Sequence, residues 1–146
     1  MSIDISGFGV GVHIVASSTF PQGFQVSQFA DDSDPIDIPS IEIAGTAMGL
    51  NGDLITWTTA VPVPVNISTI PSSDDDINLS ILASGNQAGR NKRPARDTIT
   101  LVVVYPDETR AVYTNGVLTS APPGKSIASS GRQKTNTYNF MFENNS

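Results

Sequence analysis

Apolar residues recur at every second position along most of this chain. Between Val10 and Ala16 the even positions are apolar, and near the end of the sequence Tyr138, Phe140 and Phe142 alternate with polar residues. A repeat of two places the apolar side chains on one face of an extended segment, whereas a helix needs a repeat of about 3.6. The pattern therefore predicts half-buried strands and a mainly β fold.

A long hairpin is predicted over about residues 34–60. In its first half the apolar positions change from even to odd numbers at Pro39-Ser40, and a strand changes phase in this way only through an extra residue, a twist or a bend. An Asn51-Gly52-Asp53 turn follows, and the returning half alternates again. The apolar residues assigned to this hairpin are Ile36, Ile38, Ile41, Ile43, Met48, Leu50, Ile55 and Trp57.

Two prolines at positions 62 and 64 lie on the same edge of the strand that follows. Because proline has no amide hydrogen to donate, that edge cannot continue a regular ladder, so we expect an edge strand. Two interpretations stay open for Pro62 and Pro64. They protect the edge from aggregation, or they belong to a docking site for a partner.

One short helix is predicted over about residues 73–84. Ser72 or Ser73 serves as the N-cap, and the run Asp74–Asp76 suits the positive end of the helix dipole. We expect Gly85 to end the helix. The expected apolar stripe consists of Ile77, Ile81 and Leu82. The three aspartates could also bind calcium or magnesium, but their spacing is not that of an EF-hand and capping accounts for them.

The remaining segments add strands. A turn at Pro21-Gln22-Gly23 predicts a second strand that pairs with the first, and residues 99–105 alternate as a strand covered on both sides. Asn115-Gly116 predicts a tight turn between two short strands, and residues 121–131 an exposed connection. The expected fold is one domain over residues 1–146, an antiparallel β-sandwich or barrel of about seven or eight strands with one short α-helix and a long protruding hairpin.

Composition removes most enzyme classes. The chain has no cysteine and one histidine, His13, and it contains neither a nucleophile elbow nor a phosphate-binding glycine loop. We therefore expect no enzymatic activity, no cofactor and no metal. The net charge of −6 disfavours general DNA binding, and no apolar run reaches the roughly 20 residues that a membrane anchor needs.

Two charged clusters are candidates for contacts with other molecules. The acidic residues are Asp31, Asp32, Asp34, Asp37 and Glu42. The basic residues are Arg90, Lys92, Arg93 and Arg96. The basic loop has no interleaved aromatic residues that would stack on bases. It is either a solvated loop or a complement to an acidic surface on a neighbouring chain.

The order of these segments resembles the tail tube proteins of contractile-tailed bacteriophages. Residues 24–60 are similar to that family's second strand and stacking hairpin, and residues 63–84 to its strand-to-helix unit. Residues 116–142 resemble its closing hairpin. The resemblance implies a homo-hexameric ring whose subunits share one barrel around a lumen, with rings stacked into a tube. It implies that the predicted hairpin reaches the adjacent ring.

The same resemblance implies partners and a location. The partners would be the tail sheath, the baseplate, the tail terminator and, during assembly, the tape measure protein, while DNA passes through the lumen without specific binding. The acidic cluster would line the lumen or meet a neighbouring subunit, and the basic cluster would face a neighbouring subunit or the sheath. The protein would be part of the virion after assembly in the host cytoplasm. Alternatives are a tail terminator, a baseplate tube initiator, or a carbohydrate-binding or adhesin β-sandwich.

Overall fold

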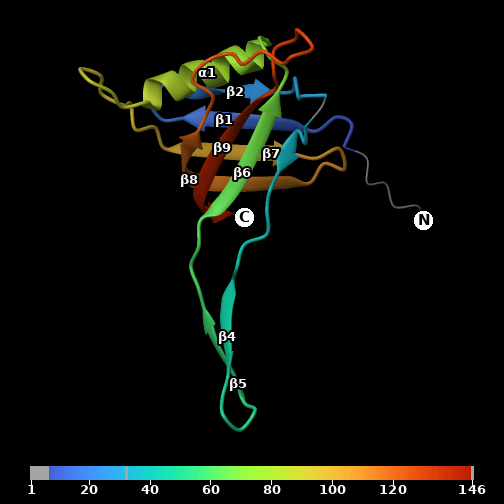
Figure 1. Ribbon diagram of the computed structural model, residues 1–146, viewed down its shortest axis with the longest axis vertical. Helices are drawn as coiled ribbons and strands as arrows, with labels where there is room; N and C mark the ends of the chain where they lie inside the picture. The colour runs from blue at the N-terminus through green and yellow to red at the C-terminus, as the bar shows by residue number, and fades with distance from the viewer. Residues whose placement is uncertain (1–6, 32, 146) are drawn as a thin grey trace.

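A curled antiparallel sheet with one helix forms the body of the protein in the computed structural model, which describes residues 7–31 and 33–145 (Figure 1). The elements are β1 (Gly11–Ala16), β2 (Phe20–Val26), β3 (Ile36–Asp37), β4 (Ala44–Met48), β5 (Leu54–Thr58), β6 (Val63–Thr69), α1 (Asp74–Asn86), β7 (Ile99–Val104), β8 (Arg110–Ser120) and β9 (Asn136–Asn145). Seven strands form the main sheet in the order β2-β1-β7-β8-β9-β6-β3. The predicted mainly β fold with one helix is confirmed, and the sheet closes only part of the way round, as a half-barrel.

The core lies between the concave face of this sheet and α1. In β1 the even residues Val12, Ile14 and Ala16 are buried, as the alternation predicted. In β9 the three aromatic residues Tyr138, Phe140 and Phe142 are buried in the same cluster. The helix closes the cluster from above by burying Leu79 and Leu82. The period of two therefore identified the inward face of the first and last strands.

The β4–β5 hairpin stands apart from the body. Its two strands form a separate sheet in which Ala44 pairs with Thr58 and Met48 with Leu54. Figure 1 shows this hairpin extending away from the half-barrel on the side opposite α1. The change of phase at Pro39-Ser40 corresponds to the interval between β3 and β4, where the chain leaves the main sheet and forms no strand from residue 38 to residue 43.

The predicted edge strand is confirmed only in part, because β3 lies beyond β6 in the sheet and Pro62 precedes β6. Pro64 pairs with Met141 of β9, while β3 covers the other side of β6 only at Asn66 and Ile67. Among the described residues, β6 is therefore without a strand partner next to Val63 and Pro64 on that side. Proline has no amide hydrogen, and at Pro64 this removes no hydrogen bond of the sheet, because no described strand lies on that side.

Two turn predictions were wrong. Asn115-Gly116 does not end a strand, because β8 runs without interruption from Arg110 to Ser120. Asn115 adopts a positive φ of 54° and shifts the register with β7, which is the geometry of a bulge. Glycine follows because the ring of Phe142 lies where a Cβ of Gly116 would be. Similarly, Gly23 lies inside β2 at a φ of 80°, and residues 17–19 make the turn.

The helix begins as predicted but buries a different face. Ser73 is the N-cap and its hydroxyl accepts a hydrogen bond from the amide of Asp76. Ile77 and Ile81 do not belong to the buried stripe, since each is about half exposed. Gly85 does not end the helix either, because α1 continues to Asn86. The buried face consists of Leu79, Leu82, Asp75 and Asp76.

Candidate functional site

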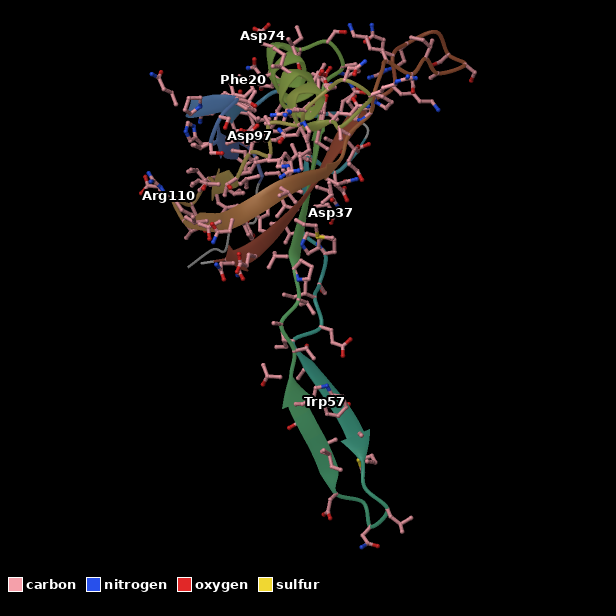
Figure 2. The ribbon with its side chains drawn as sticks, turned by 90° about the vertical axis from the view of Figure 1, so that its left-hand side faces the viewer. Phe20, Asp37, Trp57, Asp74, Asp97 and Arg110 are labelled. Atoms are coloured by element: carbon pink, nitrogen blue, oxygen red, sulfur yellow. The ribbon has the colours of Figure 1, made fainter. Side chains whose placement is uncertain are left out.

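The β4–β5 hairpin exposes an unusual number of large apolar side chains. Leu50 at the tip is fully exposed, and the other members of the group each expose at least 51% of their surface. Figure 2 shows Trp57 on the outside of the projecting hairpin. The exposed apolar residues of the hairpin are Ile43, Met48, Leu50, Leu54, Ile55 and Trp57. They lie on both faces of the hairpin, because Met48 is the cross-strand partner of Leu54, whereas Ile55 and Trp57 alternate with Leu54 along β5 and point to the opposite face. Large apolar side chains gathered on an exposed segment usually mark a contact with another molecule.

The structure divides the predicted hairpin residues into two groups. Ile36, Ile38 and Ile41 are partly buried and pack against the core of the body. The other five predicted residues extend into solvent, and Leu54, which was not among the predicted residues, is exposed with them. The alternation could not separate the groups, because residues in a free hairpin show the same period of two as residues over a core.

The hairpin has its own internal order. Gly45 and Trp57 are cross-strand partners, and the indole covers Gly45 so closely that a Cβ there would overlap it. The amide of Gly49 donates a hydrogen bond of 2.7 Å to the carbonyl of Asp53 and closes the turn. At the base, the Thr59 hydroxyl donates to the Glu42 carbonyl at 3.0 Å. Trp57 thus stiffens the hairpin. Because it is the only tryptophan of the chain, its fluorescence is a specific probe of the hairpin.

The predicted acidic cluster is spread along the chain between body and hairpin. Asp31 forms an ion pair with Arg132 at 3.2 Å, and the hydrogen bond from this guanidinium lowers the pKa of the Asp31 carboxyl. Asp34, Asp37 and Glu42 are exposed, and Figure 2 shows Asp37 near the point where the hairpin leaves the body. Asp32 lies outside the described residues.

The predicted basic loop follows the C-terminal end of α1. Arg90, Lys92, Arg93 and Arg96 are all exposed. The loop folds back on the helix, because the amide of Ala95 donates to the carbonyl of Gly85 at 2.7 Å. Within residues 7–31 and 33–145, no ion pair joins the basic loop to the acidic cluster of the same chain, since Asp31 pairs with Arg132 instead.

Three buried carboxylates anchor the body, a role that the sequence pattern did not predict. Asp76 accepts hydrogen bonds from the Tyr138 hydroxyl at 2.8 Å and from the side-chain amide of Asn136 at 2.9 Å. Asp75 accepts from the amides of residues 27 and 28. Asp97 accepts from the side chain of Asn86 and from the β1–β2 turn. The helix-start aspartates therefore tie α1 to β6, to β9 and to the segment that follows β2, in addition to capping the helix.

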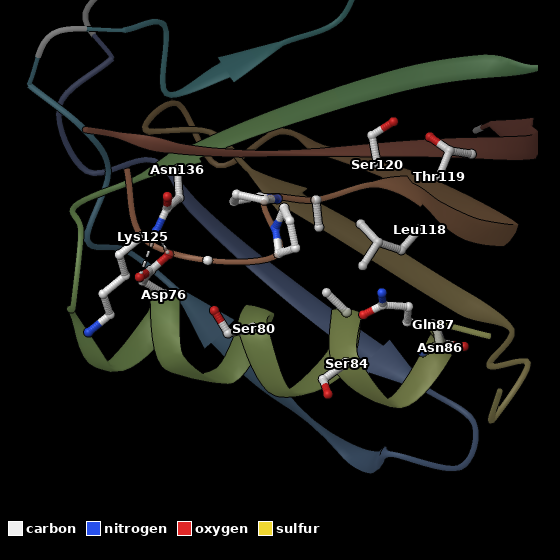
Figure 3. A pocket seen from close by; sticks show the side chains of 15 residues that line it. Asp76, Ser80, Ser84, Asn86, Gln87, Leu118, Thr119, Ser120, Lys125 and Asn136 are labelled. Carbon is white, nitrogen blue, oxygen red and sulfur yellow. Dashed lines mark hydrogen bonds between the residues drawn. The ribbon is translucent and has the colours of Figure 1, made fainter. Parts of the chain in front are cut away.

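A hollow beside Asp76 offers little for catalysis. A cavity of about 690 Å³ opens between α1 and residues 118–125, with Ser80, Ser84 and Lys125 on its wall (Figure 3). Asp76 is already occupied by neutral donors, and burial raises the pKa of the Tyr138 hydroxyl, which stays protonated as one of them. No group of three metal-ligating side chains occurs in the part of the chain that the structure describes. No described helix is long and apolar enough to cross a membrane.

Solved structures with a similar fold come from contractile injection systems. A chain of the anti-feeding prophage baseplate matches with a TM-score of 0.61 and 11% identity over 100% of this chain and 96% of its own. A chain of the anti-feeding prophage cap, the tube terminating cap, matches with a TM-score of 0.57 and 12% identity over 100% and 91%. A sheath/tube terminator chain of an extracellular contractile injection system matches with a TM-score of 0.58 and 10% identity, over 100% of this chain and 97% of its own. At these identities the likeness establishes the fold.

A comparison with family models gives the family. A search of curated proteins finds no match to the chain. The family model described as tail fiber protein gp32 matches residues 3–146, almost the entire sequence. Together with the shared half-barrel fold, this match makes the protein related to phage tails. The chain thus belongs to the tail fiber protein gp32 family.

Proposed function

We propose that this protein is a structural subunit of a phage tail tube. Six copies form a ring, the rings stack, and the hollow tube conducts DNA during infection. The observation that carries the proposal is the β4–β5 hairpin, which extends away from the body and exposes six large apolar side chains. An isolated two-stranded hairpin is only marginally stable in water, so a second molecule that covers this surface would stabilise it.

The open edges of the main sheet support ring formation. The sheet ends at β2 on one side and at β6 and β3 on the other, because the half-barrel does not close on itself. Exposed edges present unpaired amide and carbonyl groups that favour pairing with another chain. Copies placed side by side would join these edges into one larger barrel around a lumen.

The charged residues receive roles within this assembly. The exposed Asp34 and Asp37 line the lumen or meet a neighbouring subunit, and a negative lining would keep DNA from adhering. Further partners are the tail sheath, the baseplate, the tail terminator and the tape measure protein. The protein belongs to the virion and assembles in the host cytoplasm.

A terminator or baseplate tube subunit is the second candidate. The fold is shared with a tube terminating cap, a sheath/tube terminator and a baseplate chain. Such a subunit would form one ring in each particle, whereas a tube subunit forms many. Quantitative mass spectrometry of purified virions distinguishes the two, because copy number relative to the sheath protein is near one for a tube subunit.

Deleting the hairpin tip tests the tube proposal directly. We expect the purified full chain to form rings and hollow tubes in negative-stain electron microscopy. A variant without residues 47–52 should keep its circular dichroism spectrum and its urea unfolding midpoint but form no stacked tubes, because the body keeps its core. Normal tubes from this variant would remove the stacking role. Solid fibres without a lumen, or monomers at high concentration, would contradict the tube subunit itself.

A further inference from the structure

Charge is divided unequally along the chain. All eight Lys and Arg residues follow position 89, whereas ten of the fourteen Asp and Glu residues precede it. The hairpin lies entirely in the acidic half, and the loop that follows α1 lies in the basic half. The formal charge is therefore −10 for residues 1–89 and +4 for residues 90–146.

The basic end surrounds α1. The loop with Arg90, Lys92, Arg93 and Arg96 leaves the C-terminal end of the helix. A second loop, over residues 121–135, meets the other end of the helix, since the Ser72 hydroxyl donates to the side chain of Gln133 at 2.8 Å. This loop adds the exposed cations Lys125 and Lys134, and Figure 1 shows both loops beside α1.

Acidic side chains at the same end are mostly engaged. Asp75, Asp76 and Asp97 are buried and hydrogen bonded, and Asp31 is paired with Arg132. Asp74 in the first turn of α1 is the exposed exception among the described residues of this end. The hydrogen bonds come from neutral donors and leave these carboxylates charged, but the seven Lys and Arg residues of the two loops still outnumber the five carboxylates Asp31, Asp74, Asp75, Asp76 and Asp97. The surface around α1 therefore carries a small excess of positive charge.

The hairpin end has the opposite sign. Asp37 lies where the hairpin leaves the body, Glu42 at its base and Asp53 at its tip, and all three are exposed. No Lys or Arg occurs anywhere in residues 33–89. Glu42 directly precedes the exposed Ile43, and Asp53 directly precedes the exposed Leu54, so two of the acidic residues lie beside apolar residues that the proposed function assigns to stacking.

Apolar surface at the α1 end matches that of the hairpin. The two isoleucines that α1 turns away from the core, Ile77 and Ile81, are each about half exposed. Ile70 before the helix and Ile127 in the second basic loop are exposed as well. An apolar patch with a basic rim complements an apolar hairpin with acidic residues along it.

We propose that the acidic β4–β5 hairpin of one copy docks on the basic α1 end of the next copy. The inference rests on the proposed function, because it names the surface that receives the stacking hairpin. The hairpin cannot reach the α1 end of its own chain, since it points away from it (Figure 1). A contact between two different surfaces of identical subunits is open-ended, so each docked copy presents a new acidic hairpin to a further copy.

Reversing and exchanging the charges tests this contact. One variant carries Glu42→Lys and Asp53→Lys, another carries Lys92→Glu and Arg93→Glu, and a third combines all four changes. The third has the net charge of the natural protein. We expect each double variant to assemble at least about tenfold more slowly by light scattering, because like charges now face each other. The combined variant should recover most of the lost rate.

Arg93→Glu alone, which should also slow assembly, is compared with Arg110→Glu, which changes the net charge equally on an exposed residue of the body distant from α1 (Figure 2). We expect Arg110→Glu to leave the rate nearly unchanged. The proposed contact would be overturned if the Lys92→Glu and Arg93→Glu variant formed tubes at the rate of the natural protein. It would also be overturned if the combined variant assembled no faster than the double variants. Either result would leave the proposed tube subunit intact. Absence of tubes from the natural protein would remove both.

Salt gives a second measurement without any substitution. The screening length falls from about 10 Å at 0.1 M to about 3 Å at 1 M ionic strength. We expect the association rate of the natural protein to fall between these two concentrations, and the rate of the Lys92→Glu and Arg93→Glu variant to rise. Equal rates for the natural protein at both concentrations would count against the electrostatic match.

Discussion

The body and the hairpin use apolar residues in opposite ways. In the body the aromatic rows of β9 and the valines and isoleucines of β1, β6 and β7 are buried within one chain. In the hairpin the apolar residues of β4, the tip and β5 remain exposed, although the sequence alternates in both places. Alternation in the sequence therefore indicates extended segments that carry apolar residues. Whether other parts of the same chain bury those residues depends on the three-dimensional fold.

If the body and the hairpin differ in this way, the largest loss of stability should follow the substitution of a buried aromatic residue in the body. Phe140→Ala should lower the free energy of unfolding by about 3–5 kcal/mol, because it removes a fully buried ring and leaves a cavity. Trp57→Ala should cost less than about 1 kcal/mol in the same assay, since the indole is half exposed. Urea unfolding of unassembled subunits, followed by circular dichroism, measures both. Equal losses would mean that the hairpin belongs to the cooperative core.

A second prediction compares two aspartates in the first turn of α1, the buried Asp76, which accepts hydrogen bonds from β6 and β9, and the exposed Asp74. Asp76→Ala should lower the free energy of unfolding by about 3 kcal/mol, because it removes the carboxylate that accepts hydrogen bonds from the buried Asn136 amide and the Thr69 and Tyr138 hydroxyls. Asp74→Ala, at an exposed position in the same first turn, should cost at most about 1 kcal/mol.

Differential scanning calorimetry of the two variants checks this contrast. Phe140→Ala and Asp76→Ala both act on the body, so neither should alter the fluorescence of Trp57 while the subunit stays folded. If Asp74→Ala were as damaging as Asp76→Ala, the helix dipole rather than the buried acceptor would dominate this end of α1.

Much of the body could be predicted from local patterns. The strands of Val12 and Phe140 and the Ser73 cap follow from residue period and side-chain chemistry, which act over a few positions. The face of α1 could not be predicted in this way. Ile77 and Ile81 are more apolar than Asp75 and Asp76, and the aspartates are buried because donors far away in the sequence, at residues 27, 28 and 136, satisfy them.

The candidate contact surface was predictable in part. Apolar alternation beyond the acidic run, followed by an Asn-Gly-Asp turn, indicated a hairpin, but its separation from the body at Ala44 and Thr58 is a tertiary property. Asn115-Gly116 shows the same limit. A dipeptide that favours positive φ fits a hairpin turn or a bulge equally well, and the position of Phe142 beside Gly116 selects the bulge.

The third and smallest prediction concerns pH and again distinguishes the two regions. Burial favours a higher pKa for the Asp97 carboxyl, but hydrogen bonds from Thr19, Asn86 and the amide of Ser18 outweigh burial and hold this pKa below its usual range. A carboxyl with a lowered pKa in the folded state adds stability above its unfolded pKa of about 3.9 and loses it as the pH falls through the folded value. The body should therefore be constant in stability from about pH 7 to pH 5 and weaken below about pH 4.

Asp97→Asn isolates this effect, because the lowered pKa values of Asp31 and Asp107 are present in both proteins and cancel in the difference. We expect the variant to be less stable than the natural protein at pH 7 and the gap to narrow steadily toward pH 3, in urea unfolding followed by circular dichroism. The hairpin places no carboxylate in a comparable set of donors within its described residues, so the local environment of Trp57 should not change over the range in which the body weakens. A gap that stays constant with pH would show that Asp97 acts through its shape and not through its charge.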